Sequence, residues 1–84
     1  MIALENPTAF LPLFAVKKGS RWIVVDIPEG KSRAQLIRLG ILEGEAIRCI
    51  ERLPSGTVVI EKNRQEIAIG AALAKKILVE RLHG

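Results

Sequence analysis

Few side chains in this 84-residue sequence belong to the types that usually carry out chemistry. A nucleophilic mechanism needs a cysteine, serine or lysine held beside a base, and Cys49 and His83 are the only residues of their types. Cys49 falls inside an expected strand, where a buried structural thiol is the simpler interpretation, and His83 is the penultimate residue. We therefore expect no catalytic pair and predict that the chain is not an enzyme.

Metal and nucleotide sites also lack the residues that they require. A metal site takes three or four well-placed His, Cys or carboxylate ligands, whereas Glu43 and Glu45 are two carboxylates in an expected solvated loop. Neither the GxxxxGK(S/T) pattern nor the GxGxxG pattern of phosphate-binding loops occurs. We predict no metal site, no cofactor and no ATP or GTP site.

The charge balance favours a soluble surface of mixed charge. The 13 basic and 9 acidic residues give a formal net charge of +4. The basic residues are spread along the chain, whereas nucleic-acid-binding domains usually concentrate theirs, and Trp22 is the only aromatic residue in an expected strand. A small nucleic-acid-binding barrel is therefore the weaker alternative, and a mild attraction to acidic partners or anionic lipid stays open.

The N-terminal apolar segment from Ala9 to Val16 predicts neither a membrane span nor a signal peptide. No apolar run approaches the ~20 residues that a membrane-spanning helix needs. The segment lacks a basic region before it and contains Pro12, unlike a signal peptide. We expect a cytoplasmic protein.

The element that organises the rest of the chain is a short helix, expected from Ser32 to Leu39. Ser32 can accept a hydrogen bond from a free N–H of the first turn, and Gln35 can reach back to the N–H of Ser32, which predicts a capping box. Leu36 and Leu39 share one face and are expected in the core. A helix this short does not persist alone in water, so packing must hold it.

Two glycines mark the end of this helix and the start of the next element. Gly40 supplies the left-handed residue that ends the helix, and Ile41 can then contact Leu36, as in a Schellman turn. Gly44 follows four residues later and is expected to open a strand.

The remaining pattern predicts an all-β fold. Phe10 to Val16 indicates a short strand or extended arm leading into a single turn, and five further strands are expected at residues 21–27, 45–52, 57–61, 66–69 and 77–80. In the second of these, Ile50 falls on the opposite face from Ile47 and Cys49, which predicts either a bulge or burial on both faces near a barrel corner. Short antiparallel strands with tight turns suggest a small closed barrel, and the pattern alone leaves an OB-like barrel open. We expect a tail at residues 1–9 and one domain at residues 10–82.

One segment resembles the signature of the FeoA family, namely Arg33-x-x-Leu36-x-x-Leu39-Gly40-Ile41-x-x-Gly44. The likeness extends from about Leu13 to Val79. It implies an SH3-like barrel of about five antiparallel strands with one or two short helices. It also implies a cytosolic accessory protein of bacterial ferrous iron uptake. Such a protein would act as a protein-interaction module on the FeoB permease, at the inner face of the membrane.

Two observations bear on this resemblance. Many relatives have proline where this chain has Glu43, so partner contacts at that loop can differ. The C-terminal SH3-like domain of iron-dependent transcription repressors shares the pattern, which makes a metal-linked regulatory SH3-like domain a further alternative. That domain follows a helix-turn-helix region, for which we expect no room here.

An interaction barrel must expose apolar side chains that its own core does not use. The core is expected to cover Phe10 and Phe14 and to take Leu36, Leu39, Ile47, Ile67, Ile69, Ile77 and Val79. The apolar residues left over on loops are Leu42, Leu53 and Pro54. We predict that these three residues form one patch that meets the permease.

Overall fold

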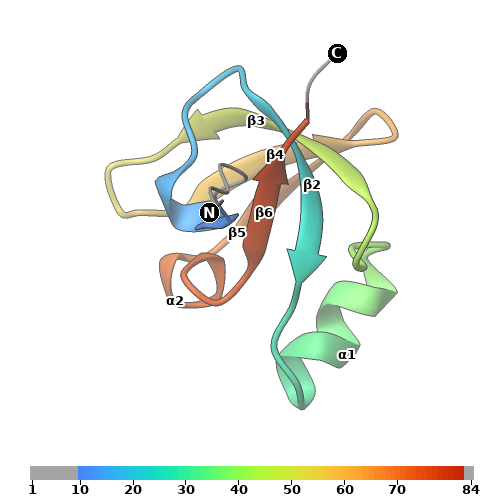
Figure 1. The fold of residues 1–84 in the computed structure, drawn as a ribbon. Coiled ribbons are helices and arrows are strands. Elements are labelled where there is room, and N and C mark those ends of the chain that lie inside the picture. The colour runs from blue at the N-terminus through green and yellow to red at the C-terminus, as the bar shows by residue number, and fades with distance from the viewer. Residues whose placement is uncertain (1–9, 83–84) are drawn as a thin grey trace, which may run out of the picture.

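The structure, a computed structural model, describes residues 10–82, so His83 and the tail predicted at residues 1–9 lie outside the described residues. The strands are β1 (Phe10–Pro12), β2 (Arg21–Asp26), β3 (Ala46–Arg52), β4 (Val58–Lys62), β5 (Gln65–Ile69) and β6 (Leu78–Arg81) (Figure 1). The helical elements are the 3₁₀ turn η2 (Leu13–Ala15), α1 (Lys31–Arg38) and α2 (Ala71–Ala74).

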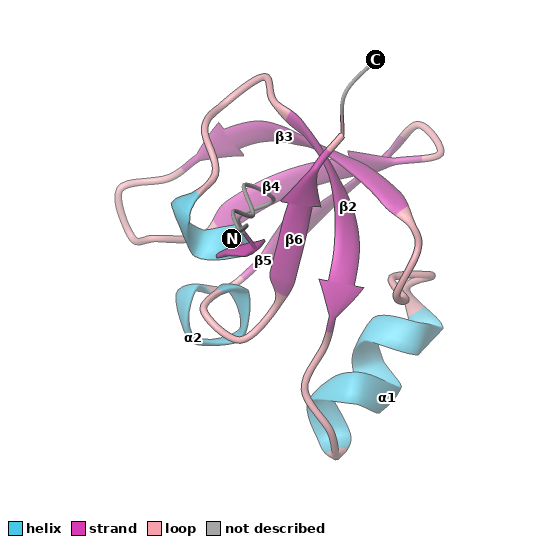
Figure 2. Ribbon diagram, viewed as in Figure 1, coloured by secondary structure: helices cyan, strands magenta, loops and turns pink. Residues whose placement is uncertain are grey.

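All the strands belong to one antiparallel sheet, in the order β1-β6-β2-β3-β4-β5. Figure 2 shows that the sheet curls, with β3, β4 and β5 passing behind β2 and β6 and both α-helices at the lower edge of the view. The all-β prediction is confirmed, with six strands rather than five. The additional strand is β1, at the position predicted as a strand or an arm.

The predicted closure of the barrel is wrong in one respect. β1 and β5 are the two ends of the strand order, and no ladder joins them within residues 10–82. β1 has three residues and ends at Pro12, which has no N–H to donate to a ladder. The sheet is therefore a curled, open barrel with β1 and β5 as its edges.

A bulge interrupts β3, which is one of the two explanations that its sequence left open. The pairing of β3 with β4 shifts register between Cys49 and Glu51, so Ile50 is the extra residue. Ile47 and Cys49 remain buried on one face, and Ile50 is only partly buried. The bulge thus explains why the apolar alternation of this strand breaks.

The curled sheet encloses one core. Its buried side chains are Leu13, Val16, Trp22, Val24, Ile27, Leu36, Ile41, Ile47, Cys49, Val58, Ile60, Ile69, Ala74, Ile77 and Val79. Phe14 and Ile67 pack partly against it. The expectation of a buried Phe10 is wrong, because strand alternation turns Leu11 towards the core and leaves Phe10 57% exposed.

The start of α1 differs from the prediction. Its N-cap is Gly30, with φ +85°, and no side chain caps the helix. Ser32 is the second residue of the helix, whereas a capping side chain belongs to the residue that precedes the first helical residue. Its hydroxyl is therefore not at the N-cap position. The predicted capping box of Ser32 and Gln35 is therefore wrong.

The end of α1 follows the prediction closely. The Gly40 N–H donates to the Ile37 carbonyl at 2.9 Å, and the Ile41 N–H donates to the Leu36 carbonyl at 2.8 Å. These two bonds define a Schellman motif, with Gly40 at φ +82°. Leu36 and Ile41 are both buried in the core, so the predicted helix end is confirmed.

Candidate functional site

An exposed leucine at the end of α1 marks the clearest candidate contact surface. Leu39 is 46% exposed, which contradicts its predicted place in the core. The reason is the Schellman motif, since it places Ile41 in the core with Leu36 and leaves Leu39 as the C-cap residue on the outside. The sequence carried that signal, because Ile41 and Leu39 could not both occupy the space beside Leu36.

A shallow hollow lies beside Leu39. It has a volume of about 320 Å³ and is lined by Gln35, Arg38, Leu39 and Ala68. Ala68 belongs to the edge strand β5 and is exposed. We call these four residues the α1–β5 surface. It combines two apolar side chains with an amide and a guanidinium, as a protein-binding surface does.

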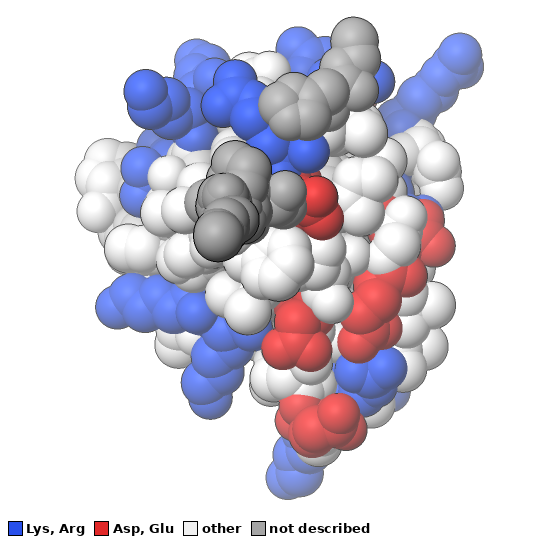
Figure 3. Space-filling view, viewed as in Figure 1, with Lys and Arg blue, Asp and Glu red and all other residues white. Residues whose placement is uncertain are grey.

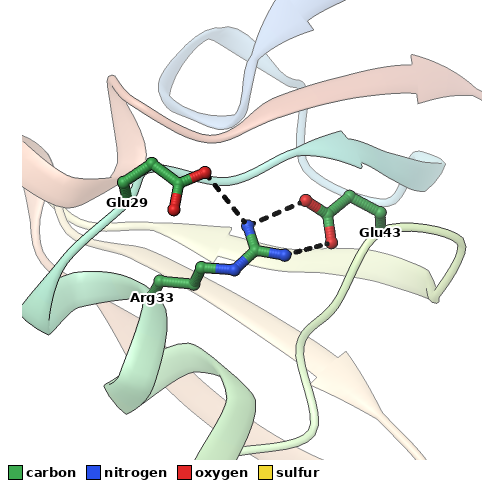
Figure 4. Close-up of polar contacts among 3 residues, drawn as sticks. All are labelled: Glu29, Arg33 and Glu43. Atoms are coloured by element: carbon green, nitrogen blue, oxygen red, sulfur yellow. Dashed lines mark hydrogen bonds and ion pairs between the residues drawn. The ribbon is translucent and has the colours of Figure 1, made fainter.

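An ion pair links α1 to the turn before β3 (Figure 4). Arg33 Nη1 donates to Glu43 Oε2 at 3.0 Å, and Arg33 Nη2 donates to Glu43 Oε1 at 3.2 Å. Glu29 Oε2 lies 4.0 Å from the same Nη1 atom. The guanidinium is thus placed between two carboxylates, and its two-pronged contact with Glu43 fixes the orientation of both side chains.

The protonation of this pair reflects its geometry. The hydrogen bonds from Arg33 hold the pKa of Glu43 below its usual range. The hydrogen bond to Glu43 raises the pKa of Arg33. Both side chains are partly exposed, so water screens the attraction and the pair positions the turn more than it stabilises the fold.

The structure does not bring the three predicted patch residues together. Leu42 precedes β3, is only partly exposed and packs against the core. Leu53, at 38% exposure, and Pro54 follow β3. The strand between them has seven residues, so about 20 Å of extended chain separates the two positions. The prediction of a single patch is wrong, and a role in binding for each residue stays a prediction.

The turn that carries Leu53 and Pro54 packs against an aromatic ring. Phe14 lies beneath two cationic groups, with Arg52 5.5 Å and Lys75 4.9 Å from its ring centre. A Cβ atom at Gly56 would lie 3.1 Å from the same ring. Cation–π contacts of this kind hold long basic side chains over an aromatic face, and here they flank the β3–β4 turn.

The aromatic residue that the sequence offered as a platform for nucleic acid is buried. Trp22 is only 4% exposed, and its indole N–H donates to Ser20 Oγ at 2.6 Å. Single-stranded nucleic acids stack on exposed aromatic rings. Trp22 is therefore a core residue with a satisfied polar atom.

Among the described residues, the side chains considered as nucleophile or metal ligands form no metal-holding cluster. Cys49 is fully buried, and its burial raises the pKa of the thiol, as expected for a structural cysteine. Within residues 10–82, no three His, Cys, Asp or Glu side chains lie close enough to hold a metal ion. Over the same range, no helix is long and apolar enough to cross a membrane.

Comparisons with known proteins agree with the fold. Residues 11–81 match the family model described as the FeoA domain. A candidate Fe(2+) transport protein A from Methanocaldococcus jannaschii is 40% identical over 70 residues, which cover 82% of this chain and 84% of that protein.

Two solved structures support the same relationship. The crystal structure of an iron uptake regulatory protein (FeoA) is 31% identical, with a TM-score of 0.79 over 88% of this chain and 99% of that one. The NMR structure of a FeoA-like protein from Clostridium acetobutylicum is 29% identical, with a TM-score of 0.79 over 93% of each chain. The SH3-like, all-β architecture and the family match lead to one conclusion: the chain belongs to the FeoA family of small proteins associated with Fe(2+) transport.

Proposed function

We propose that this chain is a cytosolic accessory protein of ferrous iron uptake and acts as a protein-interaction module on a FeoB-type permease. Within residues 10–82, no group of three His, Cys, Asp or Glu side chains could hold a metal ion. SH3-like folds instead bind partners through loops and shallow grooves. The proposed partner is a cytosolic face of the permease, and the proposed role needs no resident cofactor.

The observation that carries this proposal is the exposed Leu39 beside its hollow. The Schellman motif fixes Leu39 on the outside of the domain. The exposure of Leu39 therefore follows from the backbone conformation and does not depend on its side-chain rotamer. Ala68 and the alkyl part of Arg38 continue the apolar contact area. A single exposed leucine is common, but one that lines a hollow next to a sheet edge can receive a partner side chain.

The test is capture of the protein on membranes that contain a FeoB-type permease of the same organism. Leu39→Gln should abolish capture while leaving the melting temperature nearly unchanged, because Leu39 contributes little to the core. Ile37→Gln is a matched control on the same helix, since Ile37 is also 46% exposed but does not line the hollow. Capture of Leu39→Gln at the wild-type level would contradict the proposed surface, and failure of the wild type to bind would contradict the proposed function.

A second surface is proposed at the β3–β4 turn, where Leu53 and Pro54 are exposed. Leu53→Gln tests it in the same assay, and loss of capture by this variant alone would move the contact to that turn. Leu42 is a less suitable probe, because it packs against the core and Leu42→Glu would disturb the fold together with any contact.

A further inference from the structure

A separate hollow of about 310 Å³ collects basic side chains from several strands. Its charged lining residues are Arg21, Arg48, Glu61, Lys62 and Arg64, and none of them belongs to the α1–β5 surface. Figure 3 shows basic side chains along the top of the view, where β2 begins, β6 ends and the β4–β5 turn lies in Figure 1. We call this site the cationic hollow.

Two arginines of the cationic hollow face each other across the sheet. Arg21 on β2 is the direct partner of Arg48 on β3. Like charges in directly opposed positions of an antiparallel pair destabilise the sheet. The next partner of Arg48 is Glu61 on β4, whose carboxylate lies at 3.9 Å from the guanidinium. Arg21, in contrast, makes no ion pair with a carboxylate of residues 10–82.

A third arginine is held in a backbone conformation that disfavours it. Asn63 and Arg64 form the two-residue turn between the paired residues Lys62 and Gln65, with φ +52° and φ +67°. Turns with positive φ at both positions strongly prefer glycine at the second. Arg64 is therefore strained where glycine would not be. The strained Arg64 and the opposed pair of Arg21 and Arg48 line the same hollow, and an anionic ligand would offset their like charges.

The ion pairs of the cationic hollow indicate which kind of ligand it can bind. Lys62 is paired with Glu45 at 3.3 Å, and Arg48 with Glu61. Within residues 10–82, Arg21 and Arg64 make no ion pair. Among the described residues, two positive charges thus lack a counter-charge, and a phosphate group carries close to two negative charges near neutral pH.

We infer that the cationic hollow binds a small phosphate-bearing ligand, held by Arg21, Arg48 and Arg64. Guanidinium groups present forked donors that match phosphate oxygens. The volume of the hollow lies at the small end of the range for small-molecule sites, roughly 300–1,000 Å³. Continuing the row of cross-strand partners, Glu61 is followed by Glu66 on β5. These carboxylates would repel a long polyanion or a flat anionic membrane laid across the sheet, whereas a small ligand can stay beside the arginines.

The test is an NMR titration of the full chain with inorganic phosphate and with pyrophosphate. Saturable shifts should be confined to the backbone of β2, β3 and the β4–β5 turn and to the arginine side chains of the hollow. Arg21→Gln and Arg64→Gly should each weaken binding by about tenfold or more. Neither should lower the melting temperature, because the first relieves a like-charge contact and the second relieves strain. Lys76→Gln, which removes a charge outside the hollow, should bind as the wild type does.

Several results would overturn the inference. These are the absence of saturable shifts, unchanged binding by both arginine variants, or equally tight binding of citrate, which would show a carboxylate site. To identify the source of the phosphate, the same protein is sedimented with phosphatidylcholine vesicles that contain phosphatidylserine. Binding to these vesicles without binding of free phosphate or pyrophosphate would also overturn it. The titration contains no permease, so its failure is independent of the proposed function.

Discussion

Arg33 and Glu43, ten residues apart, are joined by two hydrogen bonds of 3.0 and 3.2 Å that tie α1 to the turn before β3. The Glu43 carboxylate thus holds the turn beside α1 through the forked donors of the Arg33 guanidinium. The pair therefore gives a way to measure how much this turn depends on side-chain contacts.

We expect Glu43→Gln to lower the melting temperature by only a few degrees at neutral pH, since the pair is solvent-accessible. The pKa of Glu43 is lowered in the folded state, so its contribution is present above the unfolded pKa and is lost as the pH falls through the folded one. The difference between wild type and Glu43→Gln should therefore shrink below about pH 4. Glu51→Gln is the control, because Glu51 makes no ion pair within the described residues. A difference that persists in acid would rule out this account.

Gly40→Val should destabilise the fold by about 1–3 kcal/mol, because a β-branched residue is poorly suited to the left-handed conformation. Gly40 has φ +82°, and a Cβ atom there would meet only the Lys62 side chain at 3.4 Å. The cost thus comes from the backbone rather than from a clash. Chemical denaturation measures it, with Gly70→Ala as the control, since Gly70 has φ −62° and open space around it. Equal stability of Gly40→Val and wild type would mean that α1 does not end in a Schellman motif.

Gly56→Ala should cost more stability than Gly19→Ala. Both glycines have left-handed φ values, +96° and +88°, so the backbone cost is similar. A Cβ atom at Gly56 would lie 2.9 Å from the Ala71 Cβ and 3.1 Å from Phe14, whereas nothing lies within 4 Å at Gly19. Overpacking of this kind costs about 1–3 kcal/mol beyond the backbone term. Equal free energies of unfolding for the two variants would show that the β3–β4 turn can move away from α2.

Cys49 should not react with a thiol reagent while the protein is folded. Its side chain is fully buried, so a reagent cannot reach the sulfur atom. Burial also raises the pKa of the thiol, so little of the reactive thiolate is present. Labelling should follow the unfolding rate and become immediate in denaturant. The control is Lys18→Cys, an exposed position on the turn before β2, which should react at once in the folded state. Rapid labelling of Cys49 in the wild type would show that β3 opens locally.

Features set by neighbouring residues could be predicted from the sequence. The helix end at Gly40 and Ile41 and the bulge at Ile50 each depend on a few consecutive side chains and on backbone rules. The capping box failed because Gly30, two residues earlier than Ser32, could begin the helix through its own backbone freedom. Local sequence offered two starts, and tertiary packing selected one.

The candidate sites were harder to predict, because they depend on strand register. The Arg33–Glu43 pair needs the turn before β3 to return beside α1, and the cationic hollow needs Arg21 and Arg48 to be direct partners. Ala68 joins Leu39 only because β5 lies at the sheet edge near α1. Single-residue patterns carry no information on such pairings, since a shift of one residue would turn each side chain to the other face.

The position of β6 has a consequence for the order in which the fold can assemble. β6 is the last strand of the described range, yet it lies between β1 and β2 in the sheet. Until β6 has been synthesised, β2 can therefore pair only with β3, and β1 has no strand to pair with. Closing these contacts requires the two ends of the domain to meet. Contacts between residues far apart in the sequence cost loop-closure entropy and form slowly. A nascent chain released before β6 is made would expose one side of β2 as a free edge, so the sheet can be completed only after β6 has been synthesised.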